Sequence, residues 1–159
     1  MSRLALLAIL LLMPLACEAQ EEANERPEPR HAVIEIGIHR VDADVADTPT
    51  RRQRGLSGRP SLTAGRGMLF PYDPPGRPVF WMPDMHFDID IVWIRAGRIL
   101  GVTANIPHQV SPPLPRYSPP GPIDLVLEVP AGSAERNGWR VGDAVRVDPT
   151  PRYRPGATD

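Results

Sequence analysis

The chain has one cysteine and no lysine, and these shortages exclude several classes of protein. Cys17 stands alone among the 159 residues, so no internal disulfide can form. All 18 basic residues are arginine, and 19 acidic residues bring the net charge to −1. Without a basic stripe, nucleic-acid binding is not expected. The sequence also lacks a Gly-x-Ser-x-Gly elbow, a phosphate-binding loop and a dinucleotide fingerprint, so nucleophilic and nucleotide chemistry have no support.

Proline and glycine are plentiful and favour strands over helices. The chain has 21 prolines and 13 glycines, a density that interrupts helices and suits short strands joined by turns. Its length provides for one hydrophobic core. We therefore predict a single β-rich domain over residues 31–148. Residues 149–159 contain three prolines and no apolar run, which predicts a loose C-terminal tail.

The N-terminus has the pattern of a secretory signal. One positive charge, Arg3, precedes an uninterrupted apolar run over residues 4–16. This run is too short to span a bilayer core, which needs about 20 residues. We predict a signal peptide over residues 1–19 and export of the chain. The acidic, proline-containing residues 20–30 that follow predict a disordered tether.

Cys17 follows directly after the apolar run, where a lipid anchor would be attached. The sequence Pro14-Leu15-Ala16-Cys17 resembles the lipobox of bacterial lipoproteins, although leucine is usual in place of Pro14. The alternative is ordinary signal cleavage after Ala19. We expect lipidation of Cys17, because the only cysteine falls at the one useful position. The chain would then be periplasmic or membrane-anchored in the cell envelope.

Alternating apolar and polar residues indicate several strands with one wet face. The alternation is clear over residues 33–38, 41–45 and 123–129. Further strands are expected over residues 67–70, 79–82, 85–94, 98–103 and 144–147. Ala96-Gly97 predicts a tight hairpin turn between two of them.

Two short helices have recognisable ends. Thr48 and Pro49 suit the N-cap and first position of a helix over residues 48–54, and Gly55 suits its C-terminal stop. Residues 133–138 carry the caps of a helix of little more than one turn.

Several motifs, in order, carry a resemblance to a bacterial family. These are Gly67-Met68-Leu69-Phe70, Phe80-Trp81-Met82, residues 89–94, Tyr117-Ser118-Pro119-Pro120, residues 127–132 and Val141-Gly142-Asp143. Together they are similar to the domain-of-unknown-function 192 family. The resemblance implies a mostly β fold, a small jelly-roll-like sandwich or half-open barrel with one or two short helices. It implies no established activity, and Asp88 stands where family members commonly have proline.

Four polar residues two apart suggest a metal site. If residues 85–94 form one strand, Asp84, His86, Asp88 and Asp90 share a face. Histidine and carboxylate on one strand can present two metal ligands, and a third would come from another element, with His108, Glu128 or His39 as the candidates. The candidate divalent-metal ligands are therefore His86, Asp88 and His108, and no other cofactor is evident. The alternative is a solvated face of an amphipathic strand.

Asp90 interrupts an apolar run and needs a partner if it is buried. An unpaired buried charge costs several kcal/mol. We expect Asp90 to be structural, paired with an arginine of the short helix such as Arg54 or held by backbone N–H groups, rather than to act as a general base.

A proline-rich loop suggests a ligand groove. Residues 106–122 contain seven prolines, and long loops in compact domains are often functional. The alternative is that these prolines stiffen a crossing between sheet edges. The candidate ligand-binding residues are Trp81, Asp84, His86, Asp88, His108 and Tyr117. We predict a non-catalytic envelope module that contacts the membrane through its anchor and binds a small ligand or envelope partner. The alternative is a metal-dependent enzyme that uses His86 and neighbouring carboxylates.

Overall fold

A computed structural model describes residues 31–108 and 112–156 as one curled sheet with two short helices. The strands are β1 (His31–Ile36), β2 (His39–Val45), β3 (Arg66–Gly76), β4 (Ile89–Arg95), β5 (Arg98–Ile106), β6 (Ile123–Pro130) and β7 (Val145–Asp148), and the helices are α1 (Pro49–Arg54) and α2 (Ser133–Arg136). The predicted signal peptide, Cys17 and the tether lie outside the described residues. Within them, no helix is long and apolar enough to cross a membrane.

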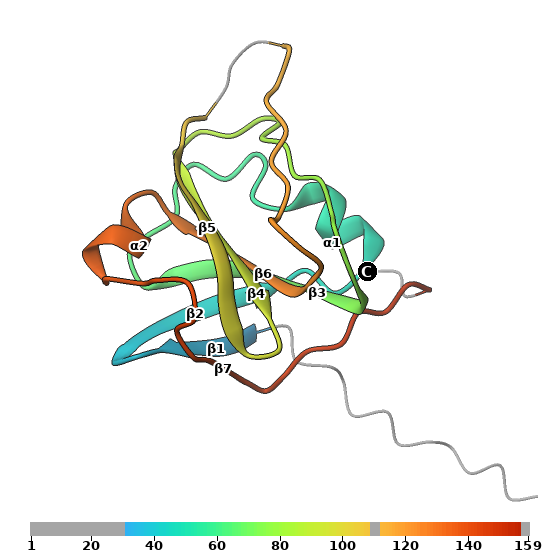
Figure 1. Cartoon of the computed structure of the whole chain (residues 1–159). Helices are drawn as coiled ribbons and strands as arrows, with labels where there is room; N and C mark the ends of the chain where they lie inside the picture. Colours follow the sequence, from blue (N-terminus) through green and yellow to red (C-terminus); the bar gives the residue numbers. More distant parts are fainter. Residues whose placement is uncertain (1–30, 109–111, 157–159) are drawn as a thin grey trace, which may run out of the picture.

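The sheet curls until its two edges approach each other. Its strands run in the order β5-β4-β6-β3-β2-β1-β7 (Figure 1). At one end of the sheet, the N–H of Ile99 donates to the carbonyl of Asp143 at 3.0 Å, and the N–H of Val145 donates to that of Gly97 at 2.8 Å. These bonds join the start of β5 to the start of β7. The predicted mostly β, half-open barrel is therefore confirmed.

One crossover in the sheet places a helix beside the barrel. β2 and β3 pair in parallel, so the chain between them must return along the sheet, and α1 lies in this connection. The Oγ1 of Thr48 accepts from the N–H of Arg51 at 3.3 Å, and Gly55 ends the helix with a φ of 51°. Both caps are those expected from the sequence. The helix α2 lies on the other side of the molecule (Figure 1).

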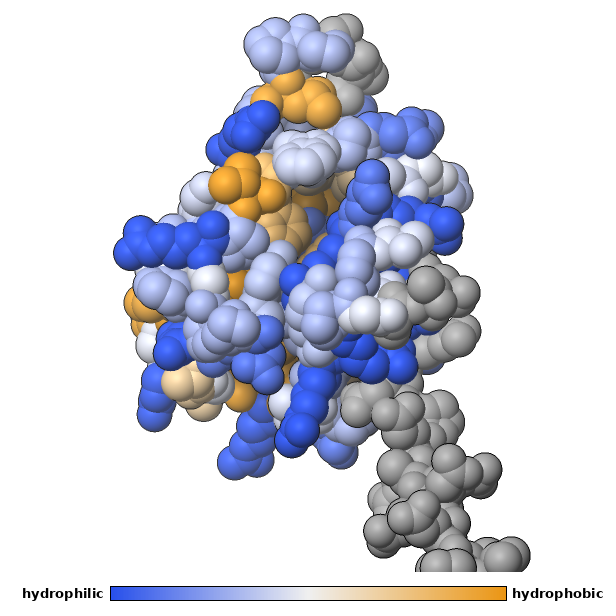
Figure 2. All heavy atoms as spheres, turned by 90° about the vertical axis from the view of Figure 1, so that its right-hand side faces the viewer, coloured by the Kyte–Doolittle hydropathy of each residue, from blue (hydrophilic) through white to orange (hydrophobic). Residues whose placement is uncertain are grey.

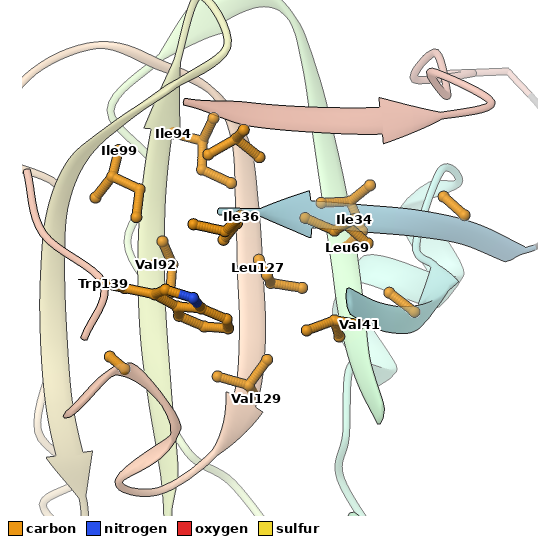
Figure 3. Packing of buried hydrophobic residues seen from close by; sticks show 14 of the residues in the cluster. Ile34, Ile36, Val41, Leu69, Val92, Ile94, Ile99, Leu127, Val129 and Trp139 are labelled. Atoms are coloured by element: carbon orange, nitrogen blue, oxygen red, sulfur yellow. The ribbon is translucent and has the colours of Figure 1, made fainter. Parts of the chain in front are cut away.

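The first hydrophobic core fills the inside of the curled sheet. Val92 of β4 and Leu127 of β6 point into it, as do Ile34 and Ile36 from the opposite wall (Figure 3). Trp139, which follows α2, packs among them. The alternation read from β1, β2 and β6 corresponds to this inner face.

A second core covers the outer face of β3, β4 and β6. Phe70, Ile91, Trp93 and Val126 contribute to it, and the chain after α1 packs against them through Leu56. The strand β4 is therefore buried on both faces, from Ile89 to Ile94. This double burial explains why β4 from Ile89 to Ile94 is apolar apart from Asp90 instead of alternating.

Two predicted strands differ from the structure. β4 begins at Ile89 and not at residue 85, and Asp84 has a φ of 51°, which an extended strand does not allow. The prediction that Asp84, His86, Asp88 and Asp90 share one strand face is therefore wrong. Residues 79–82 form a single bridge, between Phe80 and Tyr117, instead of a strand. Pro78 and Pro83 on either side of this segment lack the N–H groups that a longer ladder needs.

The chain after β7 packs back toward α1, where a loose tail was expected. Asp47 is only 1 % exposed, and Arg154 approaches it with Nη2 at 2.8 Å from Oδ2. The N–H of Arg154 also donates to the carbonyl of Asp47 at 2.8 Å. The need of a buried carboxylate for donors explains this docking, which proline content alone could not reveal.

Candidate functional site

A cavity of about 340 Å³ opens between α1 and the outer face of the sheet. We call it the α1 pocket. Its walls are residues 52–57 at the end of α1, Phe70 and Tyr72 of β3, residues 79–83 and Met85, and Glu128 of β6. Figure 2 views the molecule from the side on which α1 lies and shows a hollow with apolar atoms inside it and hydrophilic residues around it. The volume is within the usual range for small-molecule sites.

Glu128 places a buried carboxyl group in this pocket. Its β6 backbone lies between Ile91 of β4 and Met68 of β3, and the residue is only 5 % exposed. Burial raises the pKa of Glu128 to about 8, and the charge of Arg59 opposes this rise only in part. Among the described residues, no hydrogen bond or ion pair reaches the carboxyl group. Buried polar groups normally have partners, so this one is available to a ligand.

Arg52 supplies a cation to the pocket. Its guanidinium carbon lies 4.1 Å from the ring centre of Tyr72 and 3.3 Å from that of Tyr153. Nε and Nη2 are buried and have no hydrogen-bond partner within the described residues. Burial lowers the pKa of Arg52 and raises that of Tyr72 to about 12. The two rings hold the guanidinium in place by cation–π contacts and leave its hydrogen-bonding capacity unused.

Aromatic rings form the apolar wall of the pocket. Phe80 meets Phe70 edge-to-face at 5.2 Å and Trp93 at 5.6 Å between ring centres. Phe80 is held in place by two backbone hydrogen bonds with Tyr117, of 2.8 and 2.9 Å. The proline-rich loop therefore supports this wall from behind.

The far side of the pocket is closed by contacts between the chain after α1 and the turn at Pro83. The Oγ of Ser57 donates to the carbonyl of Pro83 at 2.8 Å, and the N–H of Gly58 donates to that of Asp84 at 2.9 Å. Ser57 thus uses its hydroxyl proton in a hydrogen bond to a backbone carbonyl. The lining of the pocket suits binding more than nucleophilic chemistry, because this serine has no adjacent histidine base in it.

Of the six ligand-binding candidates from the sequence, one lines the α1 pocket. Trp81 does so with 51 % of its surface exposed, and Tyr117 lies behind the wall as the partner of Phe80. Asp84, His86, Asp88 and His108 do not line it.

The metal-ligand candidates form two separate pairs. Nε2 of His86 lies 3.5 Å from Oδ1 of Asp84, and Nδ1 of His108 lies 2.7 Å from Oδ1 of Asp88. The backbone N–H of His108 also donates to Asp88, and these bonds lower the pKa of Asp88. Across residues 31–108 and 112–156, no three His, Cys, Asp or Glu side chains gather closely enough to hold a metal ion.

Asp90 is held by backbone N–H groups from the end of β5 and the start of α2. Its Oδ1 accepts from the N–H of Asn105 at 2.8 Å and of Gly132 at 3.1 Å, and its Oδ2 accepts from the N–H of Ala134 at 2.9 Å. The residue is fully buried. Arg54, the side chain proposed as its ion-pair partner, lies on α1 and lines the α1 pocket instead. Asp90 thus connects the end of β5 to the start of α2.

The sequence patterns did not identify Glu128 and Arg52 as pocket residues. Glu128, in an alternating strand with Asp124, was considered only as a third metal ligand, and Arg52 only as one of the arginines of the short helix. One signal was present, because Val126 lies between those two acidic residues on the same face. An apolar residue there indicates that part of the face is covered.

Comparisons with known proteins agree with this fold. A protein of unknown function from Novosphingobium aromaticivorans matches with 28 % identity and a TM-score of 0.63, over 73 % of this chain and 83 % of its own. A protein from Sinorhizobium meliloti, described as a candidate transcription regulator, matches with 25 % identity and a TM-score of 0.67, over 78 % of this chain and 98 % of its own.

The sequence comparisons give a family but no activity. No curated protein matches the chain at a significant level. The family DUF192, described as "Uncharacterized ACR", matches residues 32–147, which cover almost the whole of the described domain. The resemblance read from the motifs is thereby confirmed, and the chain belongs to the DUF192 family.

Proposed function

We propose that this domain is a non-catalytic binding module whose α1 pocket takes a small organic ligand. The observation that carries the proposal is Glu128, a buried carboxyl group without a partner among the described residues, on the wall of a cavity of about 340 Å³. Native proteins seldom leave such a group unsatisfied, because its desolvation costs free energy that a ligand would recover. The apolar walls around it would bury the body of the ligand.

The proposed module works outside the cytoplasm. The apolar run over residues 4–16 and the position of Cys17 support export and attachment to a membrane by a lipid. A tether of about a dozen residues would then hold the domain within tens of Å of the membrane, at an extended reach of ~3.3 Å per residue. Ligands would reach the pocket from the envelope.

Gene regulation is not proposed for this chain. The name of the Sinorhizobium protein applies to that protein, and here 18 basic residues are offset by 19 acidic ones. DNA-binding domains usually carry a basic patch or stripe that contacts phosphates.

A plugged pocket tests the binding proposal. Gln53 lines the α1 pocket from the exposed side of α1, so Gln53→Trp should fill its mouth. Thr50→Trp adds the same ring to an exposed position on the same helix, outside the lining, and is the matched control. We expect a library of small envelope metabolites to yield molecules that raise the melting temperature of the wild type and of Thr50→Trp, but not of Gln53→Trp. Equal shifts in all three chains, or no molecule that binds, would overturn the proposal.

A further inference from the structure

The two charged groups of the α1 pocket lie beside different positions of β3, with Tyr72 influenced by both. Glu128 pairs with Met68 of β3 in the sheet, whereas the guanidinium of Arg52 stacks on Tyr72, four residues further along the same strand. A strand advances by about 3.3–3.4 Å per residue, so these two levels are about 13 Å apart. The side chains of Glu128 and Arg52 form no ion pair with each other within the described residues, although both line the same cavity.

Neither charged group has an ion-pair partner among the described residues, although Asp47 acts on Arg52 and Arg59 on Glu128 from a greater distance. The cation that influences Glu128 is Arg59, but Nη1 of Arg59 lies 2.8 Å from Oδ2 of Asp44, which occupies it. Arg52 contacts two aromatic rings and has two nitrogens without hydrogen bonds in the described ranges. Arg54 also lines the pocket with an exposed guanidinium, and it lines a neighbouring hollow together with Met68 and Arg59. The pocket thus holds one buried carboxyl group and, away from it, the guanidinium of Arg52 between two aromatic rings.

Between these two groups the walls are apolar. Leu56, Phe70, Phe80, Met82 and Met85 line the middle of the cavity. The edge-to-face contact of Phe70 and Phe80 leaves aromatic surface in this wall. A ligand that satisfies the whole pocket must be elongated, with polar groups confined to its two ends.

We infer that the α1 pocket binds an elongated zwitterion, with an ammonium group at Glu128, a carboxylate at Arg52 and an apolar body between them. This inference rests on the proposed function and names the ligand class for the same site. An ammonium group offers three donors to the carboxylate, and a guanidinium is the cation that best matches a carboxylate. A free α-amino acid is too short to reach both groups. A tripeptide with free termini, which extends over about 10 Å, has the right length and polarity.

Binding of such a ligand should release a proton. Burial raises the pKa of Glu128 to about 8, so near pH 7 the empty pocket holds mostly the neutral acid. The ammonium group of the ligand stabilises the ionised form of Glu128 relative to the neutral acid. Glu128 therefore releases its proton to the solvent when the ligand binds. The charged and titratable groups around this carboxyl are Arg59, Tyr72 and the two guanidinium groups of α1. None of them titrates near pH 7 in its ordinary range, so Glu128 is the expected source of the proton.

Calorimetry with matched peptides tests the inference. The probe is alanyl-phenylalanyl-alanine, titrated at pH 7 into the full chain purified in detergent, in two buffers of different ionisation enthalpy. We expect saturable binding with a buffer-dependent enthalpy that reports proton release. Acetylation of the peptide N-terminus, amidation of its C-terminus and Glu128→Gln in the protein should each weaken binding at least tenfold. Gln53→Trp should abolish binding, and Thr50→Trp should not change it.

The outcomes separate this inference from the proposed function. Equal binding of the acetylated peptide, or unchanged binding to Glu128→Gln, would contradict the ammonium site. If no tripeptide binds while another small molecule still distinguishes Gln53→Trp from Thr50→Trp, the zwitterion is wrong and the binding module stands. If nothing distinguishes those two variants, the proposed function fails as well. The unfolding curve of Glu128→Gln shows whether that variant is folded, and Gln53→Trp provides the test that does not depend on it.

Discussion

At the scale of single residues, two buried carboxyl groups of the sheet have opposite surroundings. Asp90 receives three backbone N–H donors, whereas Glu128 receives no hydrogen bond from the described residues. Both are almost completely buried, at 0 % and 5 % exposed. The first is a structural connection and the second is the centre of the proposed site.

Removal of the Asp90 carboxylate should destabilise the fold strongly. Asp90→Ala leaves the N–H groups of Asn105, Gly132 and Ala134 without their acceptor. We expect the free energy of unfolding to fall by about 2–4 kcal/mol, measured by urea denaturation. Glu35→Ala is the control, because Glu35 is exposed on β1 and a surface change should stay within about 0.5 kcal/mol. An Asp90→Ala protein as stable as the wild type would show that these bonds contribute nothing.

Glu128 should make stability fall as pH rises. The pKa of Glu128 in the folded state is about 8, above the ordinary glutamate value of 4.5 that holds in the unfolded chain. Between these values the folded state keeps a proton that the unfolded state loses, so the contribution is complete below pH 4.5 and disappears as pH passes 8. The slope should approach roughly 1.4 kcal/mol per pH unit inside this window.

The variant Glu128→Gln isolates that effect. It should remove the slope between pH 6 and pH 8 in urea denaturation and be more stable than the wild type at the alkaline end. Glu35→Gln, at an exposed position of β1, should keep the wild-type slope. A slope that persists in Glu128→Gln would assign the proton to another group.

At the scale of elements, the sequence predicted what depends on local patterns. The strands with one inner face, such as β1 and β2, showed their alternation, and Thr48 and Gly55 marked both ends of α1. The Ala96-Gly97 turn was also right, since Arg95 pairs with Arg98 across it. These features follow from steric and capping preferences of a few neighbouring residues.

The segment before β4 could not be read in this way. Its Asp84-x-His86-x-Asp88-x-Asp90 spacing looks like a strand face, but Pro83 and the positive φ of Asp84 turn the chain there. Residues far away in the sequence hold this segment in place. Ser57 donates a hydrogen bond to the carbonyl of Pro83, and Phe80 forms a β-bridge with Tyr117. Such long-range contacts produce no periodic pattern of apolar and polar residues in the sequence. The pocket wall was therefore not predicted.

The chain after β7 should depend on Arg154 for its docking. Arg154 supplies donors to the buried Asp47 from 107 residues away. Arg154→Met should lower the free energy of unfolding by roughly 1–2 kcal/mol and speed chymotrypsin cleavage after Tyr153 severalfold. Arg152→Met, at an exposed position two residues earlier, is the matched control. If both variants are cleaved at the same rate, the pair with Asp47 does not hold the segment.

At the scale of the whole molecule, the domain is a curled sheet whose proposed ligand site lies on its outside. The inner core stabilises the fold, and the outer core, with α1 over it, forms the walls of the α1 pocket.

The anchor can be tested on the full chain in a bacterial host. Labelled palmitate should enter the wild type, and Cys17→Ser should remove the label and release the protein or block its processing. Several acyl chains together hold a protein stably, at ~0.8 kcal/mol per buried methylene. An unlabelled mature protein that begins at Gln20 would contradict lipidation and leave a soluble exported domain.

The central claim is that Glu128 is a carboxyl group without a hydrogen-bond partner among the described residues, and that it lies in a pocket that binds a ligand. The most direct measurement is a pH titration of its side-chain ¹³C carboxyl resonance, assigned by comparison with Glu128→Gln. The account predicts a midpoint near the pKa of about 8 in the free protein, moved to lower pH when the zwitterionic tripeptide is bound. A midpoint near the ordinary glutamate value of about 4.3, unchanged by any ligand, would show a solvated or already paired carboxylate and contradict the account.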